Sequence, residues 1–309
     1  MGTDKKDKFG LWSIVLLGIN SIIGTGIFLL PNRAYALMGP SSLLILLFDA
    51  FLAGCLALCF AEVAGFFSRN GGPYLYAKAA FGDFVGYEVG VLKLVVTIIA
   101  WAAMAVGFAT ALGAAFPFFA GDTMKNLIAA VLIGGLTIMN IAGVKISKIL
   151  NNLMTISKLV PLCVFIAVGL FFVNGSNFTP FVPTHMADGA FANAAITMFF
   201  AYTGFEAIAV AAEDFKDPKK DLPRGIILTM IIVTIIYMLV VGISIGILGP
   251  DLAVDKAPIQ TAFGRAVGPV GAYFILLGTL FSMGGINLAE SFIAPQAVSY
   301  THLTLPAIR

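Results

Sequence analysis

The chain has 309 residues, of which 60% are hydrophobic and 11% are charged, and its formal net charge is +2. Soluble domains carry about 25% charged residues, so this composition excludes an ordinary soluble domain and indicates an integral membrane protein. The three cysteines, Cys55, Cys59 and Cys163, all lie in apolar runs, which argues against a disulfide framework.

Eight apolar runs follow one another along the chain. A bilayer core about 30 Å thick requires about 20 helical residues at about 1.5 Å per residue, so each run predicts one membrane span. The first run is longer than the apolar core of a signal peptide and many others follow it, so we expect it to be retained as a helix. The predicted spans are 11–30, 41–66, 84–115, 127–143, 151–173, 190–212, 225–248 and 269–292.

Lysine and arginine are unevenly distributed between the two sides of these spans. With the N-terminus inside, the inner segments hold eleven of them and the outer segments hold four. Cytoplasmic loops carry the excess of positive residues, so the pattern predicts a multi-pass protein of the cytoplasmic membrane, with residues 1–10 in the cytoplasm. The inner residues are Lys5, Lys6, Lys8, Arg69, Lys78, Lys145, Lys148, Lys216, Lys219, Lys220 and Arg224, and the outer ones are Arg33, Lys125, Lys256 and Arg265.

Glycine interrupts two of the predicted spans. Span 1 contains Gly24 and Gly26 in the stretch NSIIGTGIF, and span 6 contains Gly204 in the stretch FFAYTGFE. Glycine costs a helix interior about 1 kcal/mol relative to alanine. The two spans are five apart, so they would cross the membrane in opposite directions. Paired interruptions of this kind are typical of inverted-repeat transporters, whose site lies at the breaks.

Each interruption taken alone has a simpler explanation. The glycines of span 1 could serve close packing between helices, and the aromatic residues of span 6 could form an ordinary core stripe. If the helix instead breaks at Gly24, the freed amides of its outer half would face an anionic group. The carbonyls that end its inner half would face a cation, and a zwitterion presents both charges to one such site.

Ionisable residues inside spans are functional candidates. Lys158 lies about 10 Å into span 5 at about 1.5 Å per residue, where desolvation would let its amine gain and lose a proton in the working range. The alternative is a lysine that extends to the inner interface. We expect Glu206, just past the break in span 6, to tie down freed backbone or to relay a proton. Asp49 and Glu290 are mid-span carboxylates without a partner that the sequence identifies, and Lys93 fits either pairing or snorkelling.

Other chemistries find little support in the sequence. His185 and His302 are the only histidines, and neither metal-ligand spacing nor a catalytic set can be argued. We therefore expect no metal, no cofactor and no enzymatic activity. The stretch 213–224 mixes both signs of charge, which disfavours a nucleic-acid partner.

Four stretches, in the same order along the chain, resemble the amino acid–polyamine–organocation (APC) superfamily of amino acid permeases. They are GINSIIGTGIFLLP, GGPYLYAKAAFG, NNLMTISKLVPL and FFAYTGFEAIAVAAEDFKDPKKDLPRGI, and the likeness extends from about residue 9 to 298. The resemblance implies an all-α membrane protein with the leucine-transporter fold, in which a bundle rocks against a scaffold. Its two inverted five-span repeats would be 11–173 (spans 1–5) and 174–298, an incomplete second repeat (spans 6–8).

The resemblance also implies roles for residues at both breaks. The substrate carboxylate would bind backbone amides of span 1, the ammonium would bind carbonyls of both broken spans, and Tyr202 matches the aromatic position that lines or gates the pocket. Lys158 matches the span 5 lysine of proton-coupled members. The amides are those of Ile23, Gly24, Thr25 and Gly26, the carbonyls lie near Ile19, Asn20, Phe199 and Phe200, and Ala201, Thr203 and Gly204 complete the predicted substrate site.

The end of the chain departs from that superfamily. Its members usually have ten to twelve spans, whereas here span 8 is followed by residues 299–309, which resemble neither the usual continuation nor a further span. We therefore expect a chain shortened after its eighth span, which could lack some walls of the site.

The leading functional prediction is secondary active transport of amino acids across the cytoplasmic membrane by proton-coupled symport. The implied partners are an amino acid, protons and the lipid bilayer. An exchanger of amino acids or polyamines is the alternative within the same class. A non-transporting membrane sensor or scaffold is the alternative from a different class. The sequence predicts neither the particular amino acid nor the oligomeric state.

Overall fold

The computed structural model describes residues 10–67, 72–141, 148–206, 208 and 215–301. Residues 1–9 of the predicted cytoplasmic N-terminus, residues 302–309 of the predicted tail, and several of the predicted inner cations lie outside this part. The elements of the described part are helices. They are α1 (Leu11–Ile22), α2 (Thr25–Leu29), α3 (Pro31–Met38), η1 (Gly39–Ser41), α4 (Ser42–Ala64), α5 (Pro73–Phe81), α6 (Asp83–Ala115), η2 (Pro117–Phe119), α7 (Asp122–Ile141), α8 (Lys148–Gly169), η3 (Leu170–Phe172), η4 (Gly175–Phe178), α9 (Ala190–Phe199), η5 (Phe200–Tyr202), α11 (Pro218–Leu248), η7 (Gly249–Val254), α12 (Pro258–Val267) and α13 (Pro269–Thr301).

Within the described residues each predicted span coincides with a helix or an interrupted helix, but the predicted count of eight spans is not confirmed. Within the described residues, six helices are long and apolar enough to cross a membrane, namely Pro31–Ala64, Asp83–Gly113, Asp122–Ile141, Leu153–Phe172, Lys219–Val254 and Pro269–Leu288. Predicted spans 1 and 6 instead correspond to the shorter apolar helices Leu11–Ile22 and Ala190–Tyr202. These are the two spans in which the sequence places its glycine interruptions.

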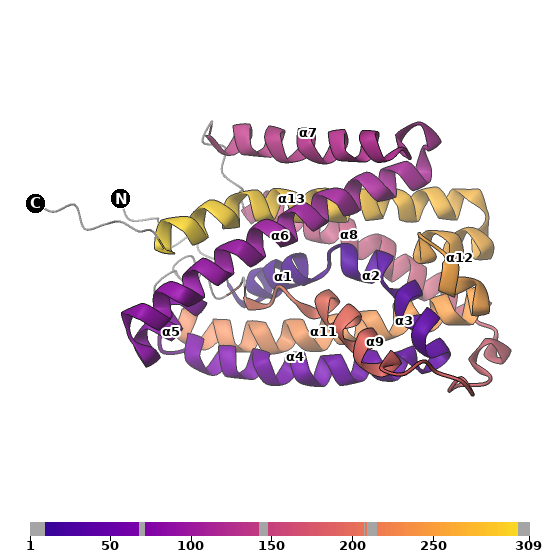
Figure 1. Cartoon of the computed structure of the whole chain (residues 1–309), viewed down its shortest axis with the longest axis horizontal. Coiled ribbons are helices and arrows are strands. Elements are labelled where there is room, and N and C mark those ends of the chain that lie inside the picture. Colours follow the sequence, from indigo (N-terminus) through magenta and orange to yellow (C-terminus); the bar gives the residue numbers. More distant parts are fainter. Residues whose placement is uncertain (1–9, 68–71, 142–147, 207, 209–214, 302–309) are drawn as a thin grey trace, which may run out of the picture.

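The interrupted helices α1 and α2 lie at the centre of the molecule (Figure 1). Helices α6, α8 and α13 pack on one side of them, and α11 with α4 covers the other, while α7 lies outermost beside α6 and α13. Helices α3 and α12 and the 3-10 helix η7 gather at one end, called here the α12 end, and α5 lies at the opposite end. The centre is therefore enclosed by long apolar helices.

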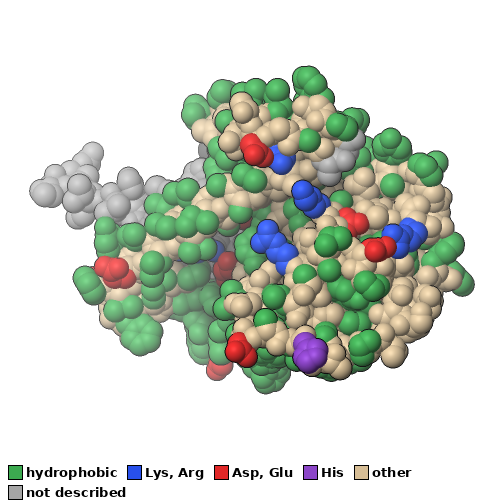
Figure 2. Space-filling model, turned by 45° about the vertical axis from the view of Figure 1, so that its right-hand side comes forward, with side chains coloured by type: hydrophobic (Ala, Val, Ile, Leu, Met, Phe, Trp, Pro, Cys, Tyr) green, Lys and Arg blue, Asp and Glu red, His purple; other side chains and the backbone are tan. Residues whose placement is uncertain are grey.

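The outer flanks of these helices are hydrophobic. Large apolar side chains such as Phe51 on α4 and Ile99 on α6 are exposed, and Cys55, Cys59 and Cys163 are exposed free thiols, in agreement with the prediction that they form no disulfide framework. Figure 2 shows charged side chains gathered at the α12 end among hydrophobic flanks. Exposed apolar surface of this extent marks a lipid-facing or interacting surface, and the bilayer is the partner that fits helices of this length.

Candidate functional site

The first predicted interruption is a real break in the helix. α1 ends at Ile22 and α2 begins at Thr25, with Ile23 and Gly24 between them in non-helical conformations. A β-carbon at Gly24 would lie 2.7 Å from Cδ1 of Ile286 on α13. Glycine at this position therefore permits the close approach of α13, as the packing alternative supposes, while the binding role of the break stays a prediction.

The second interruption is also a break. α9 ends at Phe199, the 3-10 turn η5 covers the next three residues, and Thr203 is extended. Gly204 follows with a φ of +114°, in the left-handed region that glycine adopts most readily. A β-carbon at Gly204 would overlap the carbonyl oxygen of Ser21 on α1, so only glycine fits at this contact between the two broken helices.

The two breaks face each other directly. A β-carbon at Gly26 would lie 2.8 Å from both Cα and Cβ of Ala201. The hydroxyl of Tyr237 on α11 lies 2.9 Å from the Ala201 carbonyl oxygen and 3.3 Å from the Ile22 carbonyl oxygen. The buried Tyr237 hydroxyl thus lies within hydrogen-bonding distance of one backbone carbonyl at the end of each broken helix. Tyr237 is not among the predicted site residues, although a tyrosine in the middle of an apolar span is a signal that the sequence offers.

Lys158 lies against the end of α1. Its side chain is fully buried, and its Nζ donates to the carbonyl oxygens of Asn20 at 3.0 Å and Ile23 at 2.8 Å. The hydroxyl of Ser282 on α13 donates to the same Ile23 carbonyl at 3.4 Å. Carbonyls at a helix C-terminus carry partial negative charge, so an ammonium is well placed here, and the interface-snorkelling alternative for Lys158 is wrong in this structure.

The structure reduces the set of predicted amide donors from four residues to three. The Ile23 amide departs from the prediction because it already donates to the Ile19 carbonyl at 2.9 Å and closes the last turn of α1. Gly24, Thr25 and Gly26 lie at the start of α2, where backbone amides have no acceptor within the helix. All three residues are buried, and a role for them in binding an anion stays a prediction.

The predicted carbonyl acceptors are largely engaged with groups of the protein. The Ile19 carbonyl accepts from the Ile23 amide, and the Asn20 carbonyl accepts from Lys158. The Phe200 carbonyl accepts from the Thr203 hydroxyl at 2.8 Å. The Phe200 carbonyl also accepts from the Thr203 amide at 3.3 Å, which occupies its second lone pair, so a ligand ammonium would share the Ile19 and Asn20 oxygens with protein donors.

The aromatic residues of span 6 divide between two environments. The Tyr202 ring is fully buried and packs on Tyr237 of α11, with ring centroids 5.3 Å apart. Phe199 and Phe200 are partly buried, and Thr203 is exposed. The structure therefore places Tyr202 on the α11 side of the breaks, and its role in lining or gating a pocket stays a prediction.

Charged groups converge just past the second break. Lys93 on α6 pairs with Glu206 at 2.9 Å, and each side chain is about one-fifth exposed (21% and 22%). The other carboxylate oxygen of Glu206 accepts from the Gly204 amide at 3.0 Å, as expected for a residue that ties down freed backbone. Glu290 on α13 is close enough to interact electrostatically with both Lys93 and Glu206. Lys93 is therefore paired, and the sequence could not identify its partner because the two residues are 113 positions apart.

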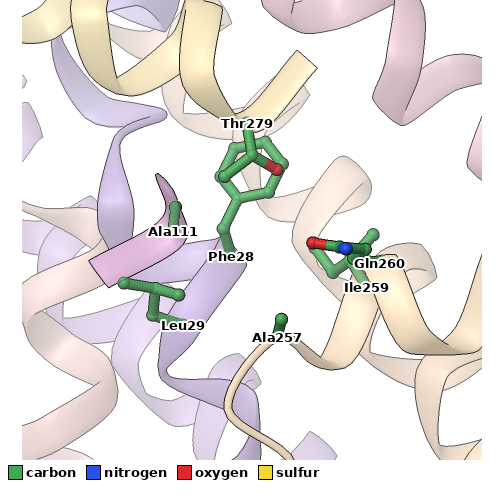
Figure 3. Close-up of a pocket in the computed structure, with 7 residues that line it drawn as sticks. All are labelled: Phe28, Leu29, Ala111, Ala257, Ile259, Gln260 and Thr279. Carbon is green, nitrogen blue, oxygen red and sulfur yellow. The ribbon is translucent and has the colours of Figure 1, made fainter. Parts of the chain in front are cut away.

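A small hollow lies toward the α12 end of α2. It is lined by Phe28, Leu29, Ala111, Ala257, Ile259, Gln260 and Thr279. Phe28 and Leu29 of α2 face Ile259 and the amide of Gln260 across the hollow (Figure 3). The Phe28 side chain is itself buried and belongs to α2, the helix that begins directly after the break at Gly24.

These features define a class of protein. Two apolar helices are interrupted and touch at their breaks, and the buried Lys158 binds carbonyls at the end of one of them. Broken helices of this kind, enclosed by long apolar helices, are typical of secondary transporters.

Comparison with known proteins agrees with that class. The family model described as amino acid permease matches residues 9–299, so the chain belongs to this family. It is 34% identical over 316 aligned residues to an uncharacterized transporter of Mycobacterium tuberculosis, covering 94% of this chain and 65% of that protein. The branched-chain amino acid permease BcaP of Bacillus subtilis is 34% identical (79% of this chain, 55% of BcaP). The serine/threonine exchanger SteT of Bacillus subtilis is 29% identical (91% of this chain, 64% of SteT).

The chain therefore spans between 55% and 65% of the length of these relatives. The family and the helical architecture confirm the predicted fold class, an all-α multi-pass membrane protein of the amino acid permease type. Membership of a permease family also places the chain among transporters and not among enzymes.

Proposed function

We propose that the protein to which this chain belongs transports amino acids across the cytoplasmic membrane by secondary active transport. The observation that carries the proposal is the direct contact of the two helix breaks beside Lys158. Amides at the start of α2 would bind the carboxylate of an amino acid, and carbonyls of α1 and η5 would bind its ammonium. Recognition of both charges selects α-amino acids as a class.

The proposal includes the orientation and the division of the chain. With residues 1–10 in the cytoplasm, the α12 end faces outward, and the hollow beside Phe28 would be the outer approach to the breaks. The Lys93–Glu206 pair would then lie on the inner side of the site. Residues 11–173 would form the first repeat and residues 174–298 the part of the second repeat present here.

The proposed coupling ion is the proton, carried by Lys158. A protonated Lys158 holds the Asn20 and Ile23 carbonyls, whereas a neutral amine binds them more weakly, because charge-assisted hydrogen bonds are about twice as strong as neutral ones. Loss of the proton would therefore loosen the end of α1 from α8. This links the charge of one side chain to the position of a broken helix.

Uptake into proteoliposomes tests the proposal. Candidate substrates are leucine, isoleucine, valine, serine and threonine, chosen from the names of the relatives. We expect an inward proton gradient to drive accumulation by the wild type and Lys158→Ala to lose this dependence on the gradient. Lys125→Ala, which removes a partly exposed lysine of α7 that pairs with the exposed Asp122, is the control and should behave as wild type. Undiminished gradient-driven uptake by Lys158→Ala would contradict the assignment of Lys158.

Exchange is the second candidate, favoured by the similarity to the exchanger SteT. In that case uptake would require an internal amino acid and would respond little to a pH gradient. Counterflow measured with and without an imposed pH gradient separates the two mechanisms.

A further inference from the structure

Asp49 is an acidic side chain in the interior of the molecule. It lies in α4, seven residues after Ser42, which corresponds to about 10 Å of helix at about 1.5 Å per residue. It belongs to the buried stripe of that helix, which is otherwise apolar or small, and only 1% of its surface is exposed. The stripe consists of Ile45, Leu46, Asp49, Ala53, Ala57, Ala61 and Ala64.

Among the residues that the structure describes, no cation forms an ion pair with the carboxyl of Asp49. Both of its oxygens are buried, and neither has a hydrogen-bond partner among the described residues. An isolated carboxylate in apolar surroundings is so unfavourable that such groups take up a proton instead. An aspartate side chain is also too short to reach an interface that lies two helical turns away.

The titratable side chains of the helices around Asp49 are tyrosines in the interior and charged residues farther from it. Helix α4 packs against α3, η1, α9, η5 and α11. Asp49 is close enough to the Tyr202 hydroxyl of η5 for the two groups to interact electrostatically. The titratable and charged side chains that these elements and α4 itself contribute are Arg33, Tyr35, Cys55, Cys59, Glu62, Tyr202, Lys219, Lys220, Asp221, Arg224 and Tyr237. Arg33 is exposed, and the charged residues of α11 lie in its first two turns.

The position of Tyr202 connects Asp49 to the helix breaks. The Tyr202 ring packs on Tyr237, and the Tyr237 hydroxyl binds the carbonyls of Ala201 and Ile22. Asp49 thus lies behind the broken helices, on the side away from α6 and α13, at the interface of α4, η5 and α11. A charge on Asp49 would have to be solvated through this interface.

We propose that Asp49 is a second proton-binding site within the membrane, separate from Lys158, and that it is protonated in the conformation described here. A neutral carboxyl fits the closed interface of α4, η5 and α11, and a carboxylate requires that interface to open. Release of the proton is therefore coupled to movement of the second helix break. The inference rests on the burial of Asp49 and does not require that the protein transports amino acids.

Infrared spectroscopy of the chain in lipid nanodiscs tests the proposal. Aspartate labelled with carbon-13 at its side-chain carboxyl shifts the C=O stretch of any protonated aspartic acid to lower frequency. We expect such an isotope-sensitive band at neutral pH in the wild type, lost in Asp49→Asn and retained in Glu290→Gln, which alters the other mid-span carboxyl. Absence of a protonated aspartate band in the wild type, or its persistence in folded Asp49→Asn, would overturn the proposal.

Asp49→Glu decides the question if Asp49→Asn fails to fold, because it keeps a carboxyl at this position and removes the labelled aspartate; loss of the labelled band in Asp49→Glu supports the proposal, and its persistence overturns it. The other described aspartates are exposed or partly exposed, so Asp49 is the buried aspartate among the described residues. The measurement uses no substrate, so its outcome is independent of the transport proposal. A protonated Asp49 in a chain that binds no amino acid would support this inference and contradict the proposed function, and the reverse result would do the opposite.

Discussion

Individual side chains stabilise the two helix breaks by donating hydrogen bonds to backbone carbonyls at the ends of the broken helices. Tyr237 serves carbonyls of both broken helices, and Lys158 serves two carbonyls at the end of α1. A buried acceptor left without a donor costs about 1–3 kcal/mol. The breaks therefore depend on these side chains as much as on glycine.

Tyr237→Phe should destabilise the protein by about 1–3 kcal/mol, because it leaves the Ala201 and Ile22 carbonyls without this donor. A lower thermal unfolding temperature in nanodiscs is the expected result. Tyr273→Phe removes a hydroxyl from a tyrosine that is 60% exposed and should unfold like the wild type. Equal unfolding temperatures for both variants would show that the Tyr237 hydroxyl does not hold the breaks.

Gly204→Ala should also be destabilising, by about 1–3 kcal/mol for the unfavourable backbone conformation and further for the overlap with the Ser21 carbonyl. The matched control is Gly54→Ala in α4, where a β-carbon meets no atom within 4 Å. This control should be neutral or stabilising by up to about 1 kcal/mol, since alanine favours a helix over glycine. Comparable stability of the two variants would contradict the contact described between α1 and the second break.

At the scale of elements, an ion pair joins the segment just past the second break to α6. Glu206 pairs with Lys93 and accepts from the Gly204 amide, so one carboxylate joins an irregular segment to a long helix. Such a link can open without unfolding either element. It therefore suits a part of the molecule that changes position.

A double-mutant cycle on Lys93→Met and Glu206→Gln should give a coupling free energy of about 0.5–3 kcal/mol, the range for groups in direct contact. Thermal or denaturant unfolding supplies the four stabilities. The exposed pair of Lys78 and Asp83 serves as a reference cycle and should give a coupling at or below about 1 kcal/mol. Additive effects at Lys93 and Glu206 would mean that the pair contributes nothing to this link.

Some of these elements could be predicted from the sequence and others could not. The spans follow from the length of apolar runs, and both breaks follow from glycine at matching places in spans 1 and 6. The depth of Lys158 in span 5 indicates a functional position but leaves snorkelling to the interface open, and the structure shows the side chain buried. The spans and the breaks depend on residues that are close together in the sequence, so composition and spacing can predict them.

The contacts between helices required the structure. Lys93 and Glu206, and Tyr237 and Ile22, are more than 100 positions apart in each pair, and the crossing of two helices is not encoded in either one alone. The Ile23 amide shows that the exact end of a helix could not be predicted either. The glycine pattern indicates a free amide at Ile23, but this amide still donates a helical hydrogen bond at the end of α1.

For the whole molecule, the arrangement has two sides around a central pair of broken helices (Figure 1). Lys158 and Ser282 hold α1 from the α8 and α13 side, and Tyr237 holds both breaks from the α11 side. Movement of the broken helices between these two sides would expose the proposed site first to one side of the membrane and then to the other.

The central claim is that the proposed site recognises both charges of an amino acid. Equilibrium binding to the purified chain in nanodiscs tests that claim most directly. The probes are L-leucine and L-serine, with their decarboxylated amines and the corresponding acids that lack the ammonium group. We expect saturable binding of at least one amino acid, weakened tenfold or more when either charge is removed, since about 1.4 kcal/mol of lost interaction is a factor of ten. Binding of neither amino acid, or equal binding of an amino acid and an analogue that lacks one charge, would contradict the account.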